Sequence, residues 1–253
     1  MGSRRNVRRS NSTMIHTSLK TTDHYMKYYF PSIITIVVCI LKTVISTRDD
    51  FDYTLRRHGI IPDVIDIAPK FAIKISYKRN ESLRMGFKVD PALMQHVPWI
   101  AWPTEAGVFY TLLMIDPDVP VRKNPAEAQR QHWVVGNIPR ENPHHGETIT
   151  SYIGPISPKN SGLHRNTFLV YSQNSRINFT EPRNSSRNRS SIRCRYKFSA
   201  RKFAEKYNLT LHAVNFVRTG WPLYDIKKKN ESSRPPKDPI RDHFAPRPEV
   251  LEI

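Results

Sequence analysis

An eleven-residue segment near the middle of the chain restricts its fold strongly. Residues 110–120 read Tyr-Thr-Leu-Leu-Met-Ile-Asp-Pro-Asp-Val-Pro. The first half is apolar, favours extended structure and is short for a helix, so it predicts a buried strand. The prolines fix φ and remove backbone donors, which holds Asp116 and Asp118 in a stiff turn. Such a turn either builds a binding site or stops a strand, and alone it favours the second interpretation.

Short apolar or alternating segments recur along the chain, separated by turns. We expect strands at residues 71–77, 85–89, 97–102, 110–116, 132–139, 148–153, 163–171 and 211–217. Successive strands with short turns predict a mainly β fold, a sandwich or a barrel. Residues 198–207 are the best helix candidate, because Phe203 and Tyr207 lie four residues apart on one helical face.

Length and charge limit the classes of function. The 253 residues suit one domain with tails, and the net charge of +18 favours acidic partners such as nucleic acid, phospholipid head groups or an acidic protein. Nucleic acid is the least favoured, because the basic residues are scattered without interleaved aromatic side chains. The basic residues Arg187, Arg189, Arg193, Arg195 and Lys197 are interpreted as a solvated loop.

Cysteine and histidine spacing predicts neither a metal site nor a cofactor. The two cysteines, Cys39 and Cys194, cannot form a disulfide framework. The chain has no CxxC pair and no Cys/His cluster at zinc spacing, so we expect no structural metal site.

The N-terminal 47 residues read as an extension with a signal-peptide-like segment. Residues 1–25 are rich in Arg and Ser, which fits a mitochondrial presequence or a solvated basic tail. The apolar run at 32–41 is short for a membrane span but fits the core of a signal peptide, and from Met26 onward a complete secretory signal can be read, with cleavage near Ser46. We therefore expect secretion, with a cytoplasmic or mitochondrial location as the alternative.

Two further features bear on the domain boundaries and on secretion. Residues 48–226 are expected to form the domain, and residues 227–253 a basic, Pro-rich, disordered tail. Removal of residues 1–47 takes away seven Lys/Arg and one Asp, which leaves a charge of +12. The glycosylation pattern Asn-x-Ser/Thr mildly supports secretion and occurs after the apolar run at Asn80, Asn178, Asn184, Asn188, Asn208 and Asn230.

Ionisable side chains stand at the ends of three predicted core strands. They are Asp116 with Asp118, then His132, then His164 with Arg165. Each histidine alone is more often a packing residue. If the three strand ends converge, histidine N–H groups are expected to bind a small anion while the aspartates orient the rings and adjust their pKa.

Over roughly residues 58–226 the chain resembles the phosphatidylethanolamine-binding protein family. The specific matches are the Asp-Pro-Asp-x-Pro turn and the later Gly-x-His-Arg, supported by residues 122–125, 132–139 and 152–155 and by a run from Ser161 to Gln173. The resemblance implies a β-sandwich with a large, mostly antiparallel central sheet, a smaller sheet and peripheral and C-terminal helices. It also implies a small cavity for phosphate-like or carboxylate-like groups, bounded by Asp116, Asp118, Pro120, His132, Pro158 and His164.

The chain departs from the family pattern on the facing wall of that cavity. Arg130-Gln131 replaces the usual Trp-His, and Asn166 replaces the usual Tyr after His-Arg. Arg130 either adds a cation beside the anion site or swings into solvent, whereas Asn166 removes an aromatic wall and a phenol donor.

The leading functional hypothesis is a secreted, monomeric, non-enzymatic binding protein. Its ligand would be a phosphate-bearing small molecule or a phospholipid head group, and its basic surface would favour an acidic protein or an anionic membrane. The alternative, implied by the resemblance, is a protein-interaction module such as a serine protease inhibitor or a kinase modulator. A phosphohydrolase using Asp116 and His132 ranks last, because the chain has no GxSxG and no Gly-rich phosphate loop.

Overall fold

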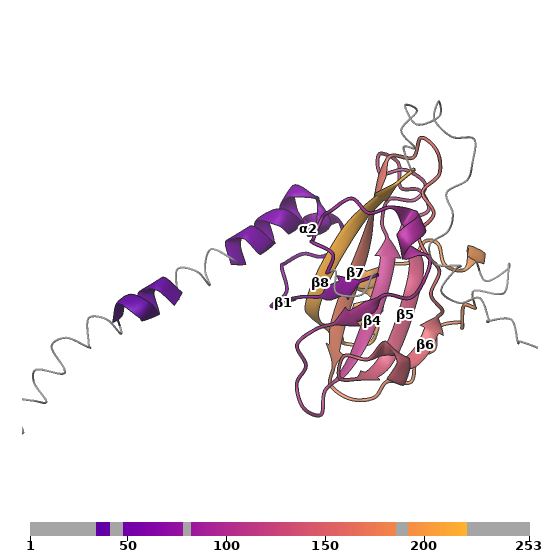
Figure 1. Cartoon of the computed structure of the whole chain (residues 1–253). Helices are drawn as coiled ribbons and strands as arrows, with labels where there is room; N and C mark the ends of the chain where they lie inside the picture. The colour runs from indigo at the N-terminus through magenta and orange to yellow at the C-terminus, as the bar shows by residue number, and fades with distance from the viewer. Residues whose placement is uncertain (1–33, 41–47, 78–81, 186–191, 222–253) are drawn as a thin grey trace, which may run out of the picture.

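The strand that leads into the Asp-Pro-Asp turn lies in the middle of a six-stranded sheet (Figure 1). The strand order is β1-β8-β7-β4-β5-β6, and only the β1–β8 pairing is parallel. The strands are Phe71–Ala72 (β1), Phe109–Asp116 (β4), Arg130–Pro139 (β5), Glu147–Thr150 (β6), Leu163–Gln173 (β7) and Thr210–Gly220 (β8).

The structure is a computed structural model that describes residues 34–40, 48–77, 82–185 and 192–221. Of the signal-peptide-like segment, residues 34–40 form a helix whose side chains are exposed. The remainder of residues 1–47 and the whole 227–253 tail lie outside the described residues. The first helix of the domain begins at residue 48. Among the described residues, no helix combines the length and the apolar character needed to span a membrane.

Both faces of the central sheet are buried, which explains why β4 reads as a continuous apolar run. On one face Leu112 and Met114 pack with Ile75 and Ile100, which come from a two-stranded sheet of Lys74–Ser76 (β2) and Trp99–Ala101 (β3). On the other face Leu113 and Ile115 enter a second core. Each fully buried side chain of this kind contributes about 1.5–3 kcal/mol to stability.

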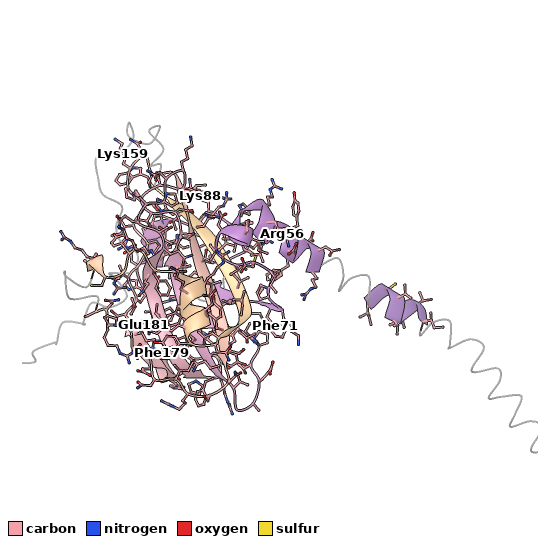
Figure 2. All side chains as sticks on the ribbon, turned by 180° about the vertical axis from the view of Figure 1, so that it is seen from behind. Arg56, Phe71, Lys88, Lys159, Phe179 and Glu181 are labelled. Atoms are coloured by element: carbon pink, nitrogen blue, oxygen red, sulfur yellow. The ribbon has the colours of Figure 1, made fainter. Side chains whose placement is uncertain are left out.

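Helices cover the second face. A helix over residues 48–57 leads into α2, Ile60–Asp63, and buries Leu55. The helix expected at 198–207 is present as α4, Ala200–Lys206; it starts later because the Ser199 side chain caps it by accepting from the Lys202 N–H. Phe203 of α4 stacks on Phe179, which Figure 2 labels beside this helix.

The strands expected at 71–77, 85–89 and 148–153 need correction. The first divides into β1 and β2, one in each sheet, and the third ends at Thr150. The second is a turn at Gly86, whose φ is +74°, followed by a single bridge from Lys88 to Arg218. The alternation of apolar and polar residues at 85–89 therefore marks a segment that hydrogen-bonds to β8 at a few positions without forming a strand. Two short 3-10 helices, Pro91–Met94 (η1) and Pro143–His145 (η2), complete the fold.

The predicted fold class is confirmed: a mainly β structure with a large, mostly antiparallel sheet, a smaller sheet and peripheral helices. The topology also fixes the location of the candidate site. Because β4 runs antiparallel to both β5 and β7, the end of β4 meets the starts of its two neighbours at one sheet edge.

Candidate functional site

The pairing of β4 with β5 and β7 brings three predicted site residues to this edge of the sheet. Asp116 is the last residue of β4 and pairs in register with Arg130, the first residue of β5. His132 follows two positions later, and His164 is the second residue of β7. All three site residues, Asp116, His132 and His164, are buried. The chain folds this way locally because two buried strands start where a third is ended by proline.

His164 is held between a carboxylate and a hydroxyl. Its Nδ1 lies 2.7 Å from Oδ2 of Asp116, and its Nε2 lies 2.9 Å from Oγ of Ser161. Oγ of Ser161 also donates to the Pro158 carbonyl at 2.7 Å, so it accepts from the His164 ring. Both ring nitrogens therefore donate, and His164 is a cation.

The pKa of His164 agrees with this assignment. Burial lowers it, but the hydrogen bond and the charge of Asp116, with a smaller contribution from Asp118, raise it overall above its ordinary value. Ser161, His164 and Asp116 are the residue types of a hydrolase triad. Here the serine proton points at a carbonyl and the histidine has no free lone pair, so His164 cannot act as a base for Ser161.

His132 has the opposite character. Its Nδ1 donates to the Ile153 carbonyl at 2.8 Å, because a carbonyl can only accept. Burial and the charge of Arg130 lower the pKa of His132 to about 4, so the ring is neutral and Nε2 carries a lone pair. Nε2 is buried and has no partner among the described residues.

These assignments correct the expectation that histidine N–H groups bind the anion. Every N–H of His132 and His164 already has a partner within the protein. His164 offers a positive charge, and His132 offers a buried acceptor. Of the expected phosphohydrolase pair, Asp116 lines the pocket, whereas His132 is not among the lining residues.

Asp118 points away from the pocket into an ion-pair network. Only 1% exposed, it accepts from the Arg165 backbone N–H and, through both oxygens, from the Arg165 guanidinium. The same guanidinium also donates to Asp63 and to the carbonyls of His58 and Gly59. The prediction that Asp118 binds ligand does not fit this geometry. We call Asp63, Asp118 and Arg165 the anchor, because they tie the α2 segment to β7.

A pocket of about 620 Å³ opens beside Asp116. Four of the six predicted ligand-binding residues line it: Asp116, Pro120, Pro158 and His164. Arg130 lines it too, so this side chain adds a cation and does not swing away. Sequence reasoning missed the remaining lining residues, which are Val119, Glu127, Ile156, Arg193, Tyr196 and Lys197.

The interpretation of the basic stretch as a solvated loop is wrong for Arg195, whereas Arg193 and Lys197 are exposed as expected, and Arg187 and Arg189 lie outside the described residues. Arg195 is completely buried and donates to the carbonyls of Ser151, at 2.8 Å, and of Asn184, at 3.3 Å. Burial and the charge of Arg130 lower the pKa of Arg195 to about 10. Its backbone carbonyl also accepts from the Gln131 N–H. Arg195 thus fastens the segment to β5 and presents the adjacent side chains to the pocket.

Arg130 is the best-placed cation in the pocket. Its guanidinium lies over the Tyr196 ring, 5.4 Å from the centroid, and its Nε is buried without a partner among the described residues. Asn166 lies elsewhere: it is fully buried in β7 and donates to Thr219 at 2.8 Å. The residue that departs from the family pattern inside the pocket is therefore Arg130 and not Asn166.

The pocket carries a positive excess. Arg130, His164, Arg193 and Lys197 face only Asp116 and Glu127 among its lining residues, and Lys197 lies 3.8 Å from Glu127. The described residues contain no group of three or more His, Cys, Asp or Glu side chains that could hold a metal ion.

The candidate glycosylation residues differ in their surroundings. Asn178 and Asn208 are exposed. Asn184 is only 7% exposed and its amide nitrogen faces Thr150 Oγ1 at 3.3 Å, so its position in the folded domain argues against a glycan there. Asn80, Asn188 and Asn230 lie outside the described residues.

Comparisons with known proteins agree with the sequence resemblance. The "Phosphatidylethanolamine-binding protein" family model matches residues 74–219. "Putative odorant-binding protein A5" of Drosophila melanogaster is 32% identical over 71% of this chain and 87% of its own length. The "26 kDa secreted antigen" of Toxocara canis is 33% identical over 64% of this chain and 61% of its own length.

A solved structure shares the fold. The phosphatidylethanolamine-binding protein from Plasmodium vivax superposes with a TM-score of 0.56 at 25% identity, covering 66% of this chain and 96% of that one. The family model matches more than half of the chain, and the fold is that of a solved family member. The chain therefore belongs to the phosphatidylethanolamine-binding protein family.

Proposed function

We propose that this chain is a non-enzymatic binding protein that holds a phosphate-like anion, free or as part of a phospholipid head group, in the pocket beside Asp116. The observation that carries the proposal is the position of Arg130, which lines the pocket beside His164 and whose Nε has no partner among the described residues. An oxyanion is the acceptor that a guanidinium binds best. The positive excess of the lining residues supports the same ligand class.

The chemistry of the site supports binding rather than turnover. Both nitrogens of His164 donate, so this ring is not a base at neutral pH, and Ser161 donates to the Pro158 carbonyl. His132 is neutral, buried and absent from the pocket lining. None of these groups is arranged as an activated nucleophile with its base.

Secretion is part of the proposal. It is supported by the signal-peptide-like run after Met26 and by the Toxocara canis relative, whose name describes a secreted antigen. Mass spectrometry of the native protein tests it. A mature N-terminus near Thr47 is expected, and a native protein that retains Met1 contradicts secretion through this signal.

The experiment for anion binding compares two arginines. Isothermal titration with inorganic phosphate and O-phosphoethanolamine is expected to show binding by the wild type. Arg130→Gln should weaken it by roughly tenfold or more, because a charge-assisted hydrogen bond is worth about 1.5–3 kcal/mol.

Arg176→Gln is the matched control. Arg176 also lies over an aromatic ring, that of Phe109, but Phe109 begins β4 at the opposite end from the pocket. This variant should change the affinity by less than about twofold, since surface charges are screened beyond roughly 8 Å at physiological salt. Equal losses in the two variants would mean that net charge, and not the pocket, governs binding.

A further inference from the structure

A carboxylate stands in the wall of a pocket that otherwise favours anions. Asp116 lines the pocket and is 3% exposed. Its Oδ1 accepts from the Asp118 backbone N–H at 2.9 Å and its Oδ2 accepts from the His164 ring at 2.7 Å. Both oxygens therefore act as acceptors, and each retains a second lone-pair site for a further donor.

A second acceptor near this wall also lacks a donor. Nε2 of His132 is buried, carries a lone pair because Nδ1 holds the proton, and has no donor among the described residues. The charges of both Arg130 and Asp116 act on this ring. A buried acceptor normally has a partner, but His132 does not line the pocket, so Asp116 is the acceptor that a ligand in the pocket meets.

These acceptors limit which anions fit. A fully ionised oxyanion placed against Asp116 sets acceptor against acceptor and charge against like charge. An oxyanion that carries one proton can donate it to the carboxylate and still present charged oxygens to Arg130. Phosphate monoesters hold such a proton below their second pKa of about 6, whereas sulfate esters have none to offer.

We propose, building on the anion-binding function above, that the pocket selects phosphate monoesters in the singly protonated form and discriminates against sulfate esters, with the P–OH donating to Asp116. Asp116 is then the residue that determines specificity, and Arg130 supplies affinity. The proposal concerns the shared chemistry of a free phosphate ester and a phosphorylated head group.

The test measures the affinities of methyl phosphate and methyl sulfate for the wild type by isothermal titration at pH 5, 6.5 and 8. At pH 5 methyl phosphate is expected to bind at least tenfold more tightly than methyl sulfate. From pH 5 to pH 8 the protonated fraction of the phosphate falls roughly a hundredfold, given its pKa of about 6, and the affinity should fall with it.

Methyl sulfate corrects for titration of the protein. The charged or titratable groups that line the pocket around Asp116 are Glu127, Arg130, His164, Arg193, Tyr196 and Lys197. Of these, His164 is the one whose ordinary pKa lies in this range. Because the sulfate carries the same charge at every pH used, any change in its affinity reports the protein alone. The ratio of the two affinities therefore isolates the ligand proton.

Two variants locate the effect. Asp116→Asn gives the wall an amide that donates to either anion, so the phosphate-to-sulfate ratio at pH 5 should fall to within about threefold of one. Glu127→Gln removes an equal charge from the same pocket, but this side chain is 46% exposed and pairs with Lys197. It should strengthen binding of both esters by similar factors and leave the phosphate-to-sulfate ratio within about twofold of the wild-type value.

The outcomes separate this proposal from the one on which it rests. If neither ester nor inorganic phosphate binds, the anion-binding function is wrong. If both esters bind equally and with parallel pH dependence, the pocket binds anions but the inference is wrong. Binding of O-phosphoethanolamine without methyl phosphate also overturns it, because Asp116 would then take an ammonium group. Wild-type selectivity and its pH profile decide the matter even if Asp116→Asn fails to fold.

Discussion

The pocket and the anchor begin at the same turn, but they differ in how far their charged side chains are paired within the protein. In the anchor, Asp118 meets Arg165 through both carboxylate oxygens, and the arginine has further partners in Asp63 and two backbone carbonyls. In the pocket, Arg130 has an Nε without a partner among the described residues, and the cations outnumber the acids. The charges on one side of the turn are paired within the protein, whereas those on the other side line a pocket with a positive excess.

This difference shows how two aspartates separated by one proline acquire different roles. Asp116 closes the sheet edge and lines the pocket, while Asp118 points toward the α2 segment. Residue type does not distinguish them. Their partners do: Asp118 is bonded to Arg165 inside the protein, and breaking such a buried ion pair is strongly destabilising, whereas Asp116 lines the pocket.

Removal of the anchor carboxylate should have the largest effect on the molecule. Asp118→Ala leaves Arg165 buried with only the half-exposed Asp63 as a charged partner. We expect the free energy of unfolding, measured by urea titration, to fall by about 3–5 kcal/mol. Asp66→Ala is the control, since this carboxylate forms an exposed ion pair with Arg201 and should cost less than about 1 kcal/mol. Similar losses would refute the contrast between a paired core and an open pocket.

The two histidines should make stability depend on pH with opposite signs. His132 has its folded pKa lowered from 6.5 to about 4, so it stabilises the fold above pH 6.5 and that contribution is lost, by about 3 kcal/mol, as the pH falls to 4. His164 has its folded pKa raised, so its contribution is present below pH 6.5 and is lost as the pH rises through the folded value.

Urea titration of the wild type, His132→Asn and His164→Asn between pH 4 and pH 8.5 measures both contributions. Relative to His132→Asn, the wild type should lose stability toward acid. Relative to His164→Asn, it should lose stability toward base. Parallel curves for the wild type and either variant would mean that the corresponding ring is not in the protonation state assigned above.

The smallest expected effect concerns how the pocket positions its cation. Tyr196→Leu removes the ring beneath Arg130 and should weaken phosphate binding two- to fivefold, in line with about 0.5–1 kcal/mol for an exposed cation–π contact. Tyr53→Leu is the matched control, because Arg57 lies over that ring on the 48–57 helix. A loss in the control equal to that of Tyr196→Leu would show that the contact has no local role.

Most of the fold could be predicted from local patterns. The apolar run of β4, the strands around His132 and His164, and the helix near Phe203 all follow from period and composition. The errors arose where backbone contacts decide the conformation. Gly86 turns with positive φ against Phe216 of β8, and alternation alone does not reveal such a turn.

The site was predictable only in part, for a physical reason. Residues on the strands of one sheet edge, such as Asp116 and His164, could be placed together from the strand pattern and the family resemblance. Arg193 and Tyr196 reach the pocket from a segment far along the chain, and their position depends on the burial of Arg195. A run of arginines looks like a solvated loop, because nothing in its composition marks the one that the fold will enclose.

The attachment of that segment has a consequence for how the pocket can diversify. Arg195 donates hydrogen bonds to the backbone carbonyl oxygens of Ser151 and Asn184, and every residue type has such an oxygen. The exception is a longer contact from Arg195 Nη2 to the Ser151 hydroxyl at 3.4 Å. These hydrogen bonds do not involve the side chains of Arg193, Tyr196 or Lys197, so the pocket lining can vary while the segment stays attached.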